Sequence, residues 1–338
     1  MRDIWKIGIQ INLGGMMKMT SKERKGDSYT DRLFHWLNSQ EKLRISHDLT
    51  IKPKVYKAYY HDKPVLLKGY RRSRVLTQQV EFFNHWHEAG SIAAVPLTFP
   101  DGSFTKSKLG CEWGIFNWIE GRHADFKRRE DRIKTYNVLR RFHRSTRGIS
   151  ILSIPKDPLY IKWSERMRQF EDTEQAFRSY RRKRLYDEIY ATMEKQLERF
   201  TDNPWGEIEQ SAWEGNEWLH GDVAHHNFII DRNQKVKIID FDLLYTGPKL
   251  YDDIQIAQRF LPHMEGYKSE FFSLFNRVKQ PRLWLQGVLV PADLLREWLY
   301  GYRRCIREEV SLSFHLGKLE RAWETRKKFV RYTEYMLR

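Results

Sequence analysis

The residues with the clearest chemical potential lie between positions 220 and 242. His220, Asp222 and Asn227 follow one another in the pattern His-Gly-Asp-x-x-x-x-Asn, and Asp240 and Asp242 come later in the pattern Ile-Asp-Phe-Asp. Phosphoryl transfer from ATP needs a carboxylate near the attacking hydroxyl and hard oxygen ligands that hold Mg²⁺ across the phosphates. The order and spacing match that reaction, with Asp222 as the base and Asn227 and Asp240 as the Mg²⁺ ligands.

Two other interpretations of this segment remain open. A polar loop could satisfy the same side chains through local hydrogen bonds and capping. Alternatively, His220, Asp222, His225 and His226 could form a hydrolase metal cluster, because imidazole and carboxylate groups suit transition metals. The metal cluster leaves Asp240 without a role, so the sequence favours phosphoryl transfer. We expect His220 to order the loop rather than to act as the base, because it precedes the carboxylate.

The chain before residue 120 has the periodicity of a small sheet. Alternating residues predict a β-hairpin with strands at 55–60 and 65–70. Helical spacing of apolar residues predicts a helix over 78–87. Two further strands are expected at 94–99 and 111–119, separated by a Pro-Asp-Gly turn.

The chain after residue 120 has the periodicity of long amphipathic helices. Apolar residues recur at three- and four-residue steps over most of this part, and strand-like segments at 227–231 and 236–239 form the exception. The sequence therefore predicts an α+β protein with two lobes. Residues 1–27 are an N-terminal extension, residues 28–119 a small β-rich N-lobe, and residues 120–338 a larger, mainly helical C-lobe that carries the catalytic loop.

Composition excludes several classes of protein. The chain has 338 residues, of which 14% are aromatic, and a chain so rich in rings is unlike a disordered one. Its two cysteines, Cys111 and Cys305, cannot build a disulfide framework or a Cys-x-x-Cys zinc site, which fits a reducing, cytoplasmic compartment. No apolar run is long enough for a membrane span, so none is expected.

The net charge of +16 is compatible with a polyanionic partner. Basic runs lie at 127–129, 140–141 and 181–184. Such runs on helices are usually solvated faces, and no nucleic-acid-binding motif accompanies them. A nucleic-acid partner is therefore not expected.

Together these motifs give the chain a family resemblance. It resembles the aminoglycoside phosphotransferase/choline kinase superfamily, whose signature is His-Gly-Asp-x-x-x-x-Asn followed by Ile-Asp-[Phe/Trp]-[Asp/Glu]. More narrowly, it is similar to the CotS-related spore-coat-associated proteins of spore-forming bacteria, and most of all to the YutH type. The resemblance covers roughly residues 30–335, and it rests on residues 66–68, 81–83, 98–102, 116–121, 139–143 and 220–242.

The resemblance implies a fold, cofactors and partners. The fold would be bilobal and protein-kinase-like, of the aminoglycoside phosphotransferase type. The cofactors would be ATP and Mg²⁺, and the substrate the hydroxyl of an unknown small molecule. The protein would be cytoplasmic and associated with the spore coat, with coat proteins as further partners.

The resemblance also assigns roles in nucleotide binding. Lys68 would contact the α- and β-phosphates, and Glu81 on the following helix would hold that lysine. Trp118 and Ile119 would lie at the hinge between the lobes and offer backbone groups to adenine. Each residue also has an ordinary structural alternative: Lys68 could be an exposed strand lysine, and Trp118 and Ile119 could be plain core.

The main departure from the family pattern is the absence of a glycine-rich loop. Residues 46–53, which precede the hairpin, contain no glycine, so the backbone cradle for ATP phosphates is replaced or missing. In addition, His226 stands where a small residue is common, and Ala224 where histidine is frequent. Two hypotheses therefore remain: an active Mg²⁺-ATP-dependent phosphotransferase, or a weak or inactive pseudokinase that serves as a structural component of the spore coat.

The sequence does not identify the acceptor. Aromatic residues of the C-lobe, namely Trp284, Trp298, Tyr302 and Trp323, could form a box for a cationic acceptor. Aromatic residues at helical spacing are more often part of a hydrophobic core, and this alternative stays open.

Overall fold

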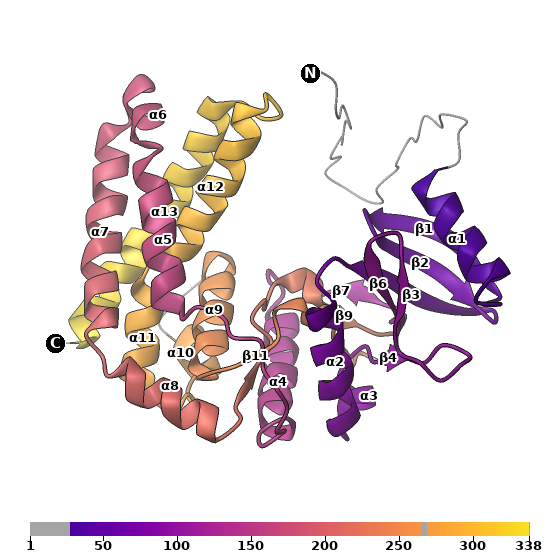
Figure 1. The fold of residues 1–338 in the computed structure, drawn as a ribbon. Coiled ribbons are helices and arrows are strands. Elements are labelled where there is room, and N and C mark those ends of the chain that lie inside the picture. The colour runs from indigo at the N-terminus through magenta and orange to yellow at the C-terminus, as the bar shows by residue number, and fades with distance from the viewer. Residues whose placement is uncertain (1–27, 265–268, 338) are drawn as a thin grey trace.

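The computed structural model describes residues 28–264 and 269–337. A sheet-rich N-terminal part is joined to a helical C-terminal part, as Figure 1 shows. The predicted α+β architecture is therefore confirmed. No helix within the described residues is both long enough and apolar enough to cross a membrane.

The N-terminal part is built on one antiparallel sheet. Its strand order is β1-β2-β3-β6-β4, and β5 pairs with the first residues of β6, on the edge where β4 pairs further along. The strands are β1 (Ile45–Lys52), β2 (Val55–Tyr60), β3 (Lys63–Tyr70), β4 (Pro96–Leu97), β5 (Lys106–Lys108) and β6 (Cys111–Asn117). The helices of this part are α1 (Tyr29–Ser39), α2 (Ser73–His85) and α3 (Ala89–Ile92).

Alternation along β3 separates the two faces of the sheet. Val65 and Leu67 are buried in the cluster that α1 covers. Lys68 lies on the opposite face, with Leu66 and Tyr70, which pack against α2. Because the side-chain period of a strand is two, this register directs Lys68 away from the core under α1 and towards the space between the two lobes.

The expected elements of the N-terminal part are confirmed with shifted bounds. The hairpin is formed by β2 and β3, with Val55 opposite Lys68. The predicted helix begins at Ser73 and ends at His85, and the strand predicted over 94–99 is reduced to β4. Strand β1 was not predicted, because along it only Ile45 is buried and the sequence therefore lacks a period of two.

Helix α2 follows the N-terminal hairpin in sequence but packs against the C-terminal core. The ring of Phe82 lies 4.9 Å from that of Trp218, and the ring of Phe83 lies 5.1 Å from that of Phe241. Trp86 contacts the same cluster. These aromatic contacts fix α2 to the catalytic segment, so α2 links the two lobes.

The connection between the lobes runs past Gly121. Strand β6 ends at Asn117, and β7 (Arg122–His123) pairs with β9 (Phe228–Ile230) of the C-terminal part. A Cβ atom on Gly121 would collide with the carbonyl oxygen of Ile230. Only glycine allows the two backbones to approach so closely.

The C-terminal part contains the helices that its periodicity predicted. Figure 1 shows α5, α7, α12 and α13 side by side, on the far side of α4 and α9 from the sheet. The helices are α4 (Arg129–Ser145), α5 (Leu159–Glu171), α6 (Glu174–Ser179), α7 (Lys183–Thr201), α8 (Trp205–Glu214), α9 (Leu250–Phe260), α10 (Glu270–Leu274), α11 (Pro281–Leu289), α12 (Ala292–Ile306) and α13 (Leu312–Leu337). The short elements among them are β8 (Trp218–Leu219), η1 (His225–Asn227), β10 (Val236–Ile238), η2 (Phe241–Leu243), β11 (Tyr245–Thr246) and η3 (Leu261–His263).

The aromatic residues considered for an acceptor box belong to the core of this helical part. Trp284, Trp298 and Trp323 are at most 3% exposed. Trp298 stacks on His315 with ring centroids 4.9 Å apart, and it stacks on Tyr302 as well. The hypothesis of an aromatic box for a cationic acceptor is therefore wrong, because rings that pack on one another in the interior are not accessible to a ligand.

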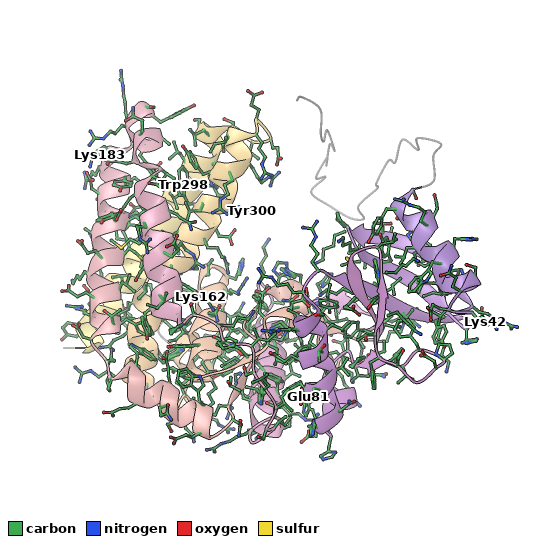
Figure 2. The ribbon with its side chains drawn as sticks, viewed as in Figure 1. Lys42, Glu81, Lys162, Lys183, Trp298 and Tyr300 are labelled. Atoms are coloured by element: carbon green, nitrogen blue, oxygen red, sulfur yellow. The ribbon has the colours of Figure 1, made fainter. Side chains whose placement is uncertain are left out.

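The basic run at 181–184 is largely paired with acidic residues. Arg182 donates to Glu320 at 3.0 Å, and Arg184 donates to Glu188 at 3.0 Å. Lys183, labelled in Figure 2, pairs with a carboxylate one turn further along α7. We therefore propose no nucleic-acid partner for this surface.

Candidate active site

The predicted catalytic loop, residues 220–227, is held in place by a carboxylate of α9. Asp252 accepts hydrogen bonds from the backbone N–H of His220 at 2.9 Å and of Gly221 at 3.1 Å. Gly221 has a φ of +78°, and a Cβ there would lie 2.5 Å from the carbonyl oxygen of Leu243. The loop that carries Asp222 therefore needs both a glycine and a buried acid, and the sequence motif does not identify Asp252.

His220 orders the loop, as the sequence predicted. Its side chain is fully buried. Its Nε2 lies 3.0 Å from the carbonyl oxygen of Ile239, and its Nδ1 accepts from the backbone N–H of Asp222 at 3.3 Å. These partners assign the N–H to Nε2. The imidazole thus connects the catalytic loop to the strand that ends before Asp240.

Asn227 and Arg259 hold the Asp222 side chain. The buried Asn227 donates from Nδ2 to the backbone oxygen of Asp222 at 2.9 Å and to its Oδ2 at 3.1 Å. Arg259, on α9, donates to Oδ1 of Asp222 at 2.8 Å. Arg259 is not part of the sequence motif. Only the packing of α9 against the loop at residues 220–227 identifies it as a partner of Asp222.

Lys68 joins the N-terminal sheet to the residues after the second hairpin. Its Nζ donates to Oδ1 of Asp240 at 2.6 Å and to Oδ1 of Asp242 at 2.7 Å. Burial lowers the pKa of the Lys68 ammonium, but the charges and hydrogen bonds of the two carboxylates outweigh burial and raise that pKa above its usual value. Burial likewise raises the pKa of Asp240, and Lys68 more than reverses that effect. The structure therefore places Lys68 beside Asp240, although 172 positions separate them.

Glu81 does not hold Lys68, which corrects that part of the prediction. Glu81 is exposed on α2, where Figure 2 labels it. The inward positions of this helix include Gln79, whose Nε2 donates to Oδ1 of Asp242 at 3.2 Å. Two residues span about 200° around a helix, so a helix that turns Gln79 inward turns Glu81 outward. The lysine therefore takes its acidic partners from the catalytic segment.

The place of the glycine-rich loop is taken by a tight turn. Residues 46–53 do not form a loop, because β1 runs to Lys52, which pairs with Val55 across the two-residue turn Pro53-Lys54. Lys54 has a φ of +66°, a conformation that glycine adopts at less cost. The Nζ of Lys52 lies 3.8 Å from Oδ2 of Asp240. The turn thus brings a cation, instead of a glycine backbone, over the mouth of the site.

Trp118 and Ile119 lie directly after β6, in the connection between the lobes, and both are half-buried. The Nζ of Lys57 lies 5.3 Å from the centre of the Trp118 ring. Their location matches the hinge that the resemblance assigns to them. Their contact with adenine stays a prediction.

The oxygen donors present suit Mg²⁺ better than a transition metal. No group of three or more His, Cys, Asp or Glu side chains within the described ranges could hold a metal ion, which leaves the histidine cluster of a hydrolase without geometric support. The backbone brings Asn227 beside the residue that precedes Asp240, because the N–H of Ile239 donates to the carbonyl oxygen of Asn227 at 2.9 Å. Mg²⁺ commonly takes one or two protein oxygens and completes its shell with water and phosphate, so an amide oxygen and a carboxylate fit it.

Comparison with known proteins assigns this architecture to a family. The family described as "Phosphotransferase enzyme family" matches residues 51–263. No curated protein sequence shows significant similarity to the chain.

Solved structures share the fold at low sequence identity. An aminoglycoside phosphotransferase from Alicyclobacillus acidocaldarius is 18% identical, with a TM-score of 0.67 over 86% of this chain and 94% of that one. The AMP-bound spectinomycin phosphotransferase APH(9)-Ia is 14% identical, with a TM-score of 0.58 over 85% and 94%. The choline kinase LicA from Streptococcus pneumoniae is 12% identical, with a TM-score of 0.54 over 89% and 100%. The predicted aminoglycoside phosphotransferase-like fold is confirmed.

Proposed function

The chain belongs to the phosphotransferase enzyme family, and from that premise we propose that it transfers the γ-phosphoryl group of ATP to a hydroxyl of a small molecule. The observation that carries the proposal is the meeting of Lys68, Asp222, Asn227 and Asp240 around one mouth, connected by hydrogen bonds. The sequence motif selected Asp222, Asn227 and Asp240, and the resemblance selected Lys68, so their proximity supports the proposal. The AMP complex of the spectinomycin phosphotransferase supports a nucleotide as the donor.

Asp222 is the proposed base. Its carboxylate takes the proton of the acceptor hydroxyl, whose oxygen forms a bond to the γ-phosphorus. The bond from that phosphorus to the β–γ bridging oxygen breaks, and ADP leaves with the bridging oxygen. Asn227 and Arg259 both donate to the Asp222 carboxylate, so its orientation is set before the substrates bind.

Lys68, Asn227 and Asp240 are the proposed nucleotide-side groups. Mg²⁺ bound by Asn227 and Asp240 would neutralise charge on the phosphates. Lys68 is already held by two carboxylates at the lobe boundary, within reach of the space where phosphates would lie. Trp118 and Ile119 are proposed to contact adenine at the hinge. Glu81 has no part in this proposal.

The experiment compares Asp222→Asn with the parent protein. We expect the rate of ADP release from Mg²⁺-ATP to fall by about 10²–10⁴, the usual contribution of a general base, while the thermal shift caused by Mg²⁺-ATP is kept. Asp187→Asn, which removes an exposed carboxylate from α7, is the control and should resemble the parent. Equal rates for Asp222→Asn and the parent would refute the role of Asp222. A parent without a thermal shift at millimolar ATP would refute the function.

A second candidate follows from the glycine-free turn between β1 and β2. The resemblance to CotS-related proteins, together with a net charge of +16, supports a weak or inactive kinase-like protein that is made in the cytoplasm and docks on acidic coat proteins of a spore. Fractionation of spores into coat extract and core tests this candidate. It predicts that the protein is in the coat extract and that Asp222→Asn assembles there as the parent does. Recovery only with the core would contradict it.

A further inference from the structure

A small cavity next to the predicted catalytic loop has four cations among its nine lining residues. Lys162 and Arg166 lie one turn apart on α5, Arg259 comes from α9, and Arg296 comes from α12. Figure 2 shows Lys162 near the end of α5 that lies beside α9. Asp293 is the one acidic side chain of the lining. The cavity therefore carries a clear excess of positive charge.

The structure offers little to compensate this charge. Asp293 is already paired with the buried Arg326 at 2.6 Å. Across residues 28–264 and 269–337, neither Lys162 nor Arg166 forms a salt bridge, and the hydrogen bond of Arg166 goes to the carbonyl oxygen of Ala292 at 2.9 Å. Lys162 has a weaker partner in the ring of Tyr245, whose centre lies 5.2 Å from its Nζ. Half-buried cations without an anionic partner are unfavourable for folding, so an anion in the cavity would reduce that cost.

Arg259 connects the cavity with the base. One of its terminal nitrogens donates to Asp222, and its Nε is buried without a hydrogen-bond partner in the described part of the chain. Burial, reinforced by the charge of Arg296, lowers the pKa of Arg166 and of Arg259 to about 10, so both remain charged at neutral pH. An anion in the cavity would pair with the guanidinium of Arg259, which already donates to Asp222.

We propose that the phosphoryl acceptor carries an anionic group, a carboxylate or a phosphate, which binds among Lys162, Arg166, Arg259 and Arg296. The proposal rests on the phosphotransferase function and specifies its substrate class. The cavity volume of about 40 Å³ has room for a small end group and not for a whole acceptor molecule. It therefore receives only the anionic end, and the hydroxyl of the acceptor lies outside it, towards Asp222.

The same cavity disfavours cationic acceptors. A quaternary ammonium or a protonated aminosugar would meet four like charges, and the tryptophans that could have bound it are inside the core. Like charges brought together are an effective means of rejecting a substrate. The acceptor class therefore differs from that of a choline kinase or an aminoglycoside phosphotransferase, as those relatives are named.

The test measures anion binding with the nucleotide subsite filled. The full-length protein, with saturating ADP and Mg²⁺, is titrated with sodium phosphate and, in a separate arm, with sodium acetate. Sodium chloride and choline chloride at equal ionic strength are the references, and the unfolding temperature is the readout. We expect saturable stabilisation by phosphate or acetate, and the stronger of the two identifies the anionic group. Arg166→Gln should weaken it about tenfold or more, the usual effect of one charge-assisted hydrogen bond.

Arg168→Gln is the matched control, because it removes the same charge from the exposed side of α5. It should bind as the parent does. If Arg166→Gln fails to fold, Arg296→Gln replaces it, since the ion pair that Arg296 forms within the described residues is to its exposed neighbour Glu297. The proposal is overturned if neither anion exceeds chloride, if choline stabilises as well, or if Arg168→Gln loses as much as Arg166→Gln. If ADP raises the unfolding temperature but neither anion raises it further, only the proposal of an anionic acceptor is refuted. If neither ADP nor ATP raises the unfolding temperature, the phosphotransferase function is refuted.

Discussion

The nucleotide side and the acceptor side of the mouth have opposite charge imbalances. On the nucleotide side, Lys68 lies between Asp240 and Asp242, so two carboxylates share this one buried cation. On the acceptor side, Arg259 pairs with Asp222, but it also lines a cavity that is rich in cations. One side is therefore suited to a metal cation and the other to an anion.

The difference between the two sides indicates how one fold could keep phosphoryl transfer while the acceptor molecule differs. The proposed nucleotide side retains the residues that the family signature describes. The acceptor side is built from α5, α9 and α12, whose side chains belong to no motif. Variants that remove one charge at a time can test whether the two sides are independent.

The largest effect is expected for Lys68→Met. It leaves Asp240 and Asp242 without their main cation, and breaking a buried pair in this way costs 3–5 kcal/mol. Because Asp242 is 36% exposed, solvent screening reduces the expected loss of unfolding free energy to about 2–4 kcal/mol. Urea unfolding measures this loss, and the thermal shift with Mg²⁺-ATP should disappear at the same time.

Lys57→Met is the control for Lys68→Met. Lys57 lies on the same sheet and pairs with the partly exposed Asp48 at 2.9 Å. Its replacement should cost less than about 1 kcal/mol, as for other surface pairs. Equal losses for the two variants would show that Lys68 has no special place between the lobes.

A smaller and different effect is expected for Arg259→Gln. This change takes one hydrogen bond from Asp222 but also removes a partly buried guanidinium with an unpaired Nε, so the two contributions partly cancel. We expect a loss of about 1–2 kcal/mol in unfolding free energy and an unchanged thermal shift with Mg²⁺-ATP. A variant that lost the nucleotide shift would show that the two sides of the mouth are coupled.

The pH dependence of stability should sharpen the comparison further. The folded-state pKa of Asp240 is held below its usual value by Lys68, despite burial. The contribution of this carboxylate to stability is therefore fully present above its unfolded pKa of about 3.9 and is lost as the pH falls through the lower folded value. Acid titration of the unfolding free energy should show a shallower decline for Asp240→Asn than for the parent. Parallel curves would contradict the role of the Lys68 pair.

The sequence could predict the nucleotide side because its parts are local or follow a fixed order. The spacing of Asp222 and Asn227 is set by one loop, and the family resemblance identifies Lys68 on the second strand of the predicted hairpin. Asp252, Arg259 and Arg166 could not be found in this way, because their roles depend on how helices pack. The placement of Glu81 failed for a related reason: periodicity predicts a helix, but tertiary contacts decide which of its polar residues faces the site.

The smallest effect on stability, and the sharpest test of the nucleotide side, is expected for Lys52→Ala. Its Nζ is 3.8 Å from Asp240 and its side chain is 58% exposed, so the unfolding free energy should change by less than about 0.5 kcal/mol. If Lys52 contacts the ATP phosphates in place of the backbone N–H groups of a glycine-rich loop, its removal should raise the Kd for Mg²⁺-ATP about three- to tenfold. Lys63→Ala, which removes an exposed lysine at the other end of the sheet, should leave the Kd unchanged. Equal Kd values for Lys52→Ala and the parent would mean that the turn between β1 and β2 does not contact the phosphates, and that Lys68 and the bound metal are sufficient to hold them.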